Sequence, residues 1–139
     1  MNIDDATFNR IYNQVKAQER ERRENAQGNF HGEAENAFSS VAEVSTLIAN
    51  SAPAADVIDA FFELRNHIEG ARRNWLLHFT GDEFGDPRPF NDNVMVYDEK
   101  VGDYCARKEV HAAQNAVRCL VPIAARIYGD AIPVADLMI

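Results

Sequence analysis

The chain has 139 residues, of which 46% are hydrophobic and 26% are charged, and its formal net charge is −8. A chain of this length can form one domain that buries roughly two-thirds of its unfolded surface, so it needs neither a metal nor a disulfide for stability. The negative charge argues against unaided binding to the phosphate backbone of a nucleic acid, and it suits a basic protein partner.

The cysteines and the apolar runs bear on where the protein works. Cys105 and Cys119 lie on one predicted helix, about 21 Å apart along its axis, which is too far for a disulfide. We therefore expect a reducing, cytoplasmic compartment, with both cysteines buried as small core residues. Residues 1–5 are too acidic for a secretory signal, and no apolar run approaches the roughly 20 residues that span a membrane.

The N-terminal segment predicts a first helix over residues 1–27. Asp4 or Asp5 can cap this helix. The apolar residues that follow recur at helical spacing and are Phe8, Ile11, Tyr12 and Val15. Residues 16–27 favour helix by propensity but carry almost no apolar surface. We therefore expect the second half of the helix to project into solvent or to meet a partner, and Gly28 to end it.

The next two predicted helices supply much of the core. Residues 33–49 have apolar side chains at helical spacing, and the short connection over residues 50–53 should set the following helix antiparallel. Residues 54–79 form the clearest element, because their apolar residues step by four and three over nearly three heptads. The residues of this seam are Val57, Phe61, Leu64, Ile68, Ala71 and Trp75.

Residues 103–128 predict the last helix, which Pro122 should kink or break and Gly129 should end. The tail, residues 130–139, is unusually apolar, so it either packs back on the body or offers a hydrophobic hook to another chain. The predicted fold class is therefore all-α. Residues 1–139 should form one compact bundle of about four helices, with a long loop between the third and the fourth.

This loop, residues 80–102, is rich in glycine, proline, aspartate and asparagine. Residues 80–103 carry seven acidic residues against two basic ones, and aromatic side chains stand among them. Residues 94–97 fit either a strand or the start of a helix. Long loops of this kind often bind other molecules. The predicted partner-binding residues are Asp82, Glu83, Phe84, Asp86, Phe90, Asp92 and Tyr97.

No catalytic site, metal site or cofactor is predicted. The four histidines lack the spacing of di-iron and zinc motifs, and the glycine patterns that bind phosphate are missing. The acidic loop could surround calcium, but it lacks the EF-hand spacing, so a solvated loop is the better interpretation.

A row of arginines on the predicted third helix keeps ligand binding open. Arg65 and Arg72 are seven residues apart and share a helix face, and Arg73 follows directly. Such a row could bind an anion, such as a phosphate or a nucleotide, through bidentate guanidinium contacts. The interpretation that we favour is that these arginines neutralise Glu63, Glu69 and other acids.

Three functions remain open. The first is a non-catalytic acidic module that binds a basic protein, for example one that itself binds nucleic acid, and inhibits or masks it, as inhibitor, immunity and counter-defence proteins do. The second is an assembly component that forms homo-oligomers through the C-terminal tail or the first helix. The third is a helical protein that binds a small molecule or a nucleotide through the arginine row. We favour this third function, which includes the case of an enzyme, less than the other two.

Overall fold

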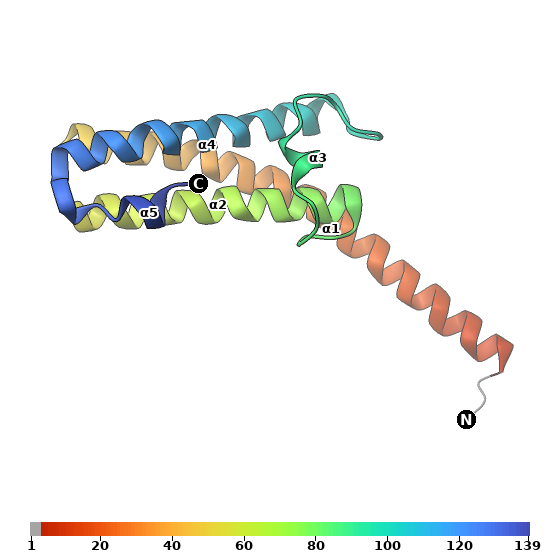
Figure 1. The fold of residues 1–139 in the computed structure, drawn as a ribbon. Helices are drawn as coiled ribbons and strands as arrows, with labels where there is room; N and C mark the ends of the chain where they lie inside the picture. The colour runs from red at the N-terminus through yellow and green to blue at the C-terminus, as the bar shows by residue number, and fades with distance from the viewer. Residues whose placement is uncertain (1–3) are drawn as a thin grey trace.

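The computed structural model describes residues 4–139, and all regular secondary structure in this part of the chain is helical (Figure 1). The all-α class predicted from the sequence is therefore confirmed, while residues 1–3 of the predicted first helix lie outside the described residues. In chain order the elements are α1 (Asp5–Ala49), α2 (Ala54–Thr80), α3 (Arg88–Asn91), α4 (Val101–Tyr128), a 3-10 turn (Gly129–Ala131) and α5 (Val134–Leu137).

A single helix, α1, takes the place of the two helices expected over residues 1–27 and 33–49. The predicted break at Gly28 is wrong, because Gly28 keeps helical backbone angles and lies on the exposed side of the helix. Phe30 and Ala34 are buried in the core directly after it. Their packing offsets the weak helix propensity of glycine, which costs about 1 kcal/mol relative to alanine.

The apolar seam predicted in α2 is confirmed and forms the centre of the core. All six seam residues are buried. α1 contributes small buried residues, among them Ala34, Ala37 and Ser40, and small side chains let two helix backbones approach closely. α2 and α4 each pack along α1 more extensively than they pack on each other. As predicted, α1 and α2 run antiparallel (Figure 1).

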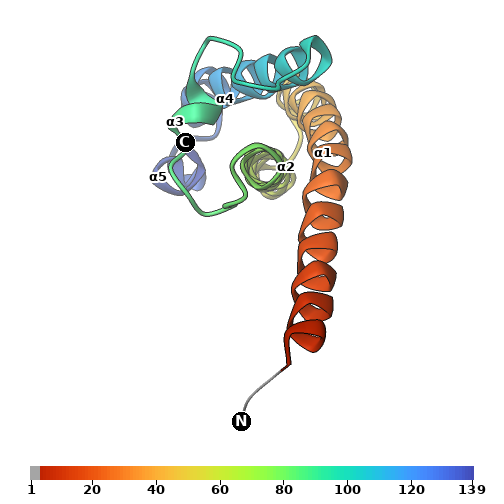
Figure 2. The ribbon, with the colours of Figure 1, turned by 90° about the vertical axis from the view of Figure 1, so that its right-hand side faces the viewer.

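The N-terminal part of α1, residues 5–22, extends beyond the bundle, and we call it the arm (Figures 1 and 2). Residues 16–25 are exposed apart from the partly buried Arg23, and Ala26 is the first residue of α1 that is buried in the bundle. The apolar stripe of the arm lies in solvent as well. Helix length explains the arrangement, because α1 has 45 residues while α2 and α4 have 27 and 28, so one end of α1 has nothing to pack against.

Asp4 caps the arm, as the sequence predicts. Its carboxylate accepts a hydrogen bond from the main-chain N–H of Thr7 at 2.7 Å. That bond to the main chain of Thr7 lowers the pKa of Asp4, as expected for a carboxylate that accepts hydrogen bonds at a helix N-terminus.

α4 continues unbroken through Pro122, so the predicted break near Val121 is not observed. Pro122 is exposed, and on that side of the helix water can satisfy the carbonyl that loses its N–H partner. Cys105 and Cys119 are exposed as well, contrary to the prediction of core cysteines. Both lie off the buried stripe of α4, which includes Ala106, Val110, Ala113 and Val117.

The apolar tail packs back on the body, which is one of the two predicted possibilities. Ile132 and Leu137 are buried, and Met138 packs partly buried against the core. Figure 2 shows α5 on the side of the bundle away from α1. The main apolar residues of the tail are therefore not free to act as a hook for another chain.

Replacing Gly28 by alanine tests the continuity of α1. A Cβ atom at Gly28 meets nothing within 4 Å, so Gly28→Ala is expected to raise the free energy of unfolding by about 0.5–1 kcal/mol. Urea-induced unfolding followed by circular dichroism measures this change.

Gly81→Ala is the matched control, because Gly81 ends α2 with a φ of 79°, a left-handed conformation that costs other residues about 1–2 kcal/mol. This substitution should destabilise the protein while Gly28→Ala stabilises it. A destabilising Gly28→Ala would indicate a helix end near residue 28 and would contradict the continuous α1.

Candidate functional site

Arg107 organises the segment that joins α2 to α4. Its side chain is 0% exposed, and its guanidinium donates five hydrogen bonds. Two of them reach the Glu99 carboxylate, each at 2.9 Å. The other three reach the main-chain oxygens of Phe90, Asp92 and Val94. Because arginine has five N–H donors, the guanidinium is fully satisfied inside the protein.

Aromatic side chains cover this buried ion pair. The guanidinium carbon of Arg107 lies 5.2 Å from the centre of the Trp75 ring and 5.3 Å from that of Tyr104. Phe90 in turn packs edge-on against Trp75, with 5.6 Å between ring centres. Charges that are removed from water are tolerated only when they are paired and hydrogen-bonded. Loss of either Arg107 or Glu99 would therefore leave the other charge buried without a partner. One side chain thus holds the loop on the bundle.

Several acids of the predicted acidic surface are bound within the chain. Glu83 pairs with Arg22 of α1 at 2.7 Å, and Asp86 pairs with Arg88 inside the loop. The hydrogen bonds from Arg88 lower the pKa of Asp86. Together with the buried Glu99, these pairs leave much less free negative charge on the loop than the sequence suggests.

Asp103 fastens the start of α4 to α1. Its carboxylate accepts hydrogen bonds from Gln27 at 3.0 Å and from His31 at 2.6 Å. Burial raises the pKa of Asp103, but the hydrogen bonds from His31 and Gln27 outweigh burial, and the net effect is a lowered pKa. Asp103 therefore joins α4 to α1 instead of facing solvent.

The loop also exposes large apolar side chains. Tyr97 is 91% exposed, and Val94 and Met95 are exposed beside it. Asp98 has a φ of 65°, in the left-handed region that aspartate tolerates, and the chain turns back there. The turn leaves Tyr97 outside while Glu99 enters the core. Large apolar side chains exposed on an ordered backbone are typical of interaction surfaces.

The arm leaves the bundle at a reciprocal contact between α1 and the end of α2. Arg23 donates two hydrogen bonds, of 3.1 and 2.8 Å, to the main-chain oxygen of His78. Nδ1 of His78 donates to the main-chain oxygen of Arg23 at 2.7 Å. The last carbonyl groups of a helix have no hydrogen-bond donor within the helix. Arg23 supplies such a donor to the carbonyl group of His78 near the end of α2. This contact fixes the point from which the arm projects.

A cavity of about 660 Å³ lies where the arm, the end of α2 and the loop meet, and we call it the corner cavity. Lys16 and Arg20 line it from the arm, Trp75 and Phe79 from α2, and Tyr97 from the loop. Three basic and three acidic residues are among the lining, so the cavity carries no net formal charge. The indole N–H of Trp75 is buried and has no hydrogen-bond partner among the described residues.

Of the seven predicted partner-binding residues, six are at least partly exposed and one is buried. Phe90 is 0% exposed, because α3 turns it into the core against Trp75, so the prediction that it anchors a partner is wrong. Phe84 lies against Arg73 at 5.3 Å, and Tyr97 lines the corner cavity. The four acidic members, Asp82, Glu83, Asp86 and Asp92, make hydrogen bonds within the loop or to α1.

The predicted arginine row divides into two parts. Arg65 and Arg72 line a second cavity between α2 and α4, whereas Arg73 is not part of that lining. Arg72 and Arg73 both pair with Glu69, which agrees with the favoured interpretation. Arg65 instead donates to the main-chain oxygen of Asp136 in α5.

Arg107 and the residues that line the corner cavity from the arm were not among the predicted site residues. Arg107 falls on the buried stripe of α4 between Asp103 and Val110, and a charge on an apolar helix face is a signal of a buried ion pair. Lys16 and Arg20 give no such signal, because only the fold brings them to the loop.

No protein-family model, curated protein or solved structure matches the chain. Within residues 4–139, no three His, Cys, Asp or Glu side chains are grouped as a metal site requires. In the same part of the chain, no helix is both long enough and apolar enough to cross a bilayer. The geometry of the chain itself therefore carries the functional inference.

Arg107→Met is expected to lower the free energy of unfolding by about 3–5 kcal/mol, because it leaves Glu99 buried without its charged partner. Urea-induced unfolding measures the change. Arg88→Met is the control, since it removes an exposed ion pair from the same loop and should leave the unfolding midpoint unchanged. If the two substitutions lowered the free energy of unfolding equally, the conclusion that Arg107 holds the loop on the bundle would be contradicted.

Proposed function

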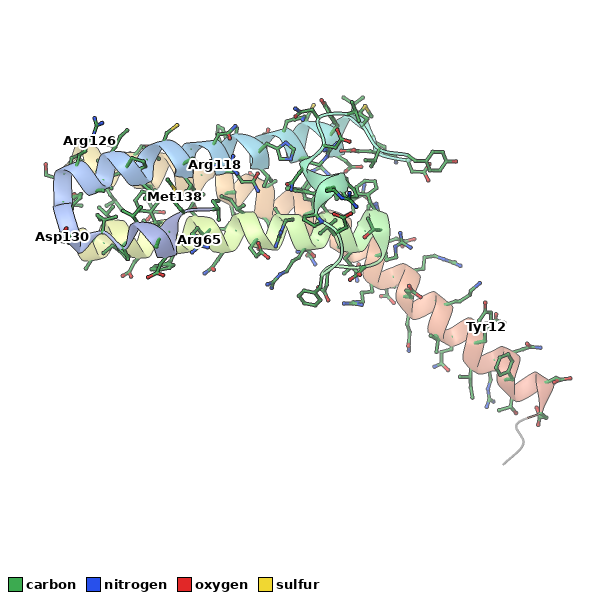
Figure 3. All side chains as sticks on the ribbon, in the orientation of Figure 1. Tyr12, Arg65, Arg118, Arg126, Asp130 and Met138 are labelled. Carbon is green, nitrogen blue, oxygen red and sulfur yellow. The ribbon has the colours of Figure 1, made fainter. Side chains whose placement is uncertain are left out.

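We propose that this chain is a non-catalytic protein-binding module that docks a partner on the apolar stripe of the arm and in the corner cavity. The exposed stripe is the observation that carries the proposal. Its residues Phe8, Ile11, Tyr12 and Val15 all face solvent, with Phe8 57% exposed. Figure 3 shows Tyr12 on the arm, clear of the bundle.

The spacing of the stripe fits a helix that lies in a groove. The four residues stand at positions i, i+3, i+4 and i+7, which is the pattern by which an amphipathic helix presents its apolar side to a partner. Large apolar side chains gain free energy when another surface removes them from water. The chain's own bundle does not reach the stripe, so a second molecule supplies that surface.

The corner cavity extends the docking surface toward the bundle. Lys16 and Arg20 line it, and Lys16 directly follows the last stripe residue, Val15. Tyr97, which is 91% exposed, adds aromatic surface there, and Phe79 lines the cavity from the end of α2. Aromatic and arginine side chains near the middle of an interface commonly supply much of its binding energy.

The net charge of −8 favours a basic partner. Several acids of the loop are paired within the chain, so this charge acts by long-range attraction and not through one acidic patch. The stripe then provides the affinity at short range. Where the covered surface of the partner is its working surface, for example a nucleic-acid-binding groove, the module inhibits the partner by masking it.

A charge-bearing arm tests the proposal. The double substitution Ile11→Glu and Val15→Glu is expected to lower recovery of the partner at least about tenfold, because two carboxylates must be desolvated in an apolar interface. The tagged protein is incubated with a lysate of its source cells, and bound proteins are identified and quantified by mass spectrometry. Circular dichroism checks that the arm is still helical.

Phe38→Glu is the matched control. Phe38 is 64% exposed on the same helix, but it lies along the bundle and not on the arm. This variant should recover the partner as well as the wild-type protein does. Equal recovery by the arm variant, or no specific partner at all, would overturn the proposal, and binding that is insensitive to salt would contradict a basic partner.

A second copy of the chain is the alternative occupant of the arm. If two arms pair antiparallel, Phe8 of one copy meets Val15 of the other, and Ile11 meets Tyr12, so the stripe is complementary to itself. Two stripes alone bury less than the roughly 1,200–2,000 Å² of a standard interface, so this dimer would be weak.

Light scattering of the purified protein distinguishes the two occupants. Self-pairing of arms predicts a mass that rises toward twice the monomer mass of 15.6 kDa with concentration, and that stays at the monomer value in the Ile11→Glu, Val15→Glu variant. A monomer at all concentrations rules out this second function and leaves the stripe to a different protein.

A further inference from the structure

We infer that the cavity between α2 and α4 binds a phosphate-bearing small molecule of about nucleotide size, separately from the protein-docking surface. This α2/α4 cavity has a volume of about 810 Å³. Sites for small ligands commonly measure roughly 300–1,000 Å³. α3 and the C-terminal segment border it, and Figure 1 shows both lying between α2 and α4.

Positive charge is concentrated in this cavity. Arg65 and Arg72 line it from α2, and Arg118 lines it from α4, against Glu69 as the one acidic side chain in the lining. Figure 3 shows Arg65 and Arg118 on the two helices, with the segment of Met138 between them. In a chain with a net charge of −8 such an excess of cations is unusual, and residues far apart in the sequence create it.

Arg65 and Arg72 keep unused hydrogen-bonding capacity, whereas Arg118 donates to the main-chain oxygen of Ile139 and to the side chain of Asn115. The Nε atoms of Arg65 and Arg72 are buried and have no hydrogen-bond partner among the described residues. Each guanidinium is held by another of its nitrogens, Arg65 by the main chain of Asp136 and Arg72 by Glu69. A buried donor without a partner is unfavourable, and the edge of a guanidinium matches two oxygens of a phosphate.

The rest of the lining suits the uncharged part of such a ligand. Asn66, Gln114 and Asn115 place side-chain amides in the cavity, and each amide can both donate and accept. Nε2 of His111 donates to the main-chain oxygen of Phe90 at 2.8 Å, which leaves Nδ1 as an acceptor. Burial lowers the pKa of His111, so the ring is neutral at neutral pH.

An apolar wall completes the cavity. Phe62, which is partly exposed, and Ile68 line it beside the arginines. Phosphate oxygens account for the guanidinium groups, amides and an imidazole acceptor can read a polar ring edge, and Phe62 offers a face on which a base can stack. A simple inorganic anion would use only the first of these features.

Isothermal titration with inorganic phosphate, AMP, ATP and citrate tests this inference on the full chain. AMP and ATP are expected to bind more tightly than phosphate, with one site per chain, and citrate is expected to bind more weakly than AMP or ATP. Arg72→Ala and Arg118→Ala should each raise the Kd about tenfold or more, because each removes charge-assisted hydrogen bonds. Arg73→Ala is the matched control, since Arg73 neighbours Arg72 but is not part of the lining.

Absence of AMP and ATP binding would overturn the inference. The inference would also be overturned if citrate bound as tightly as AMP and ATP, or if Arg72→Ala and Arg118→Ala left binding unchanged. Either result would indicate a general attraction of anions. The arm variant Ile11→Glu, Val15→Glu should bind these probes as the wild-type protein does. Failure of this inference is therefore distinguishable from failure of the protein-binding proposal.

Discussion

The buried ion pair between Arg107 and Glu99 is the interaction on which the functional surfaces depend. Arg107 uses all five of its donors on the loop, so the loop has one low-energy path across the end of the bundle. Trp75, which covers the guanidinium, also lines the corner cavity. The Phe90 oxygen that Arg107 binds also accepts the hydrogen bond from His111 in the α2/α4 cavity. The Arg107 side chain therefore contacts residues that line the corner cavity and residues that border the α2/α4 cavity, and it positions both.

A mismatch of helix lengths explains why the chain has a free apolar surface at all. α1 is more than half as long again as α2 and α4, so the bundle can bury only its C-terminal part. The reciprocal contact of Arg23 and His78 marks where burial ends. Beyond it the helix still carries an apolar stripe, which the fold leaves uncovered. In the bundle, by contrast, acids and bases pair with each other, and the tail covers apolar surface.

Local patterns in the sequence predicted what depends on local structure. The heptad seam from Val57 to Trp75, the Asp4 cap and the end of α4 at Gly129 all follow from periodicity and capping, and all are confirmed. The break at Gly28 was wrong because packing of Phe30 and Ala34 overrides glycine propensity. Exposure of the apolar stripe in the first half of the first helix could not be predicted, since it depends on the lengths of the neighbouring helices. Burial of Phe90 and Glu99 likewise depends on Arg107, a contact across the fold that no local spacing reveals.

Hydrogen exchange of the wild-type protein and of Arg107→Met, measured far from the unfolding transition, tests most directly whether this side chain holds the loop. We expect faster exchange that is confined to residues 88–100. The affected amides include that of Val96, which donates to the Glu99 carboxylate, and that of Glu99, which donates to the main-chain oxygen of Val96. The amides within α1 and α2 should stay as protected as in the wild-type protein. Unchanged exchange in the loop, or an equal rise in every helix, would contradict the central place of the Arg107–Glu99 pair.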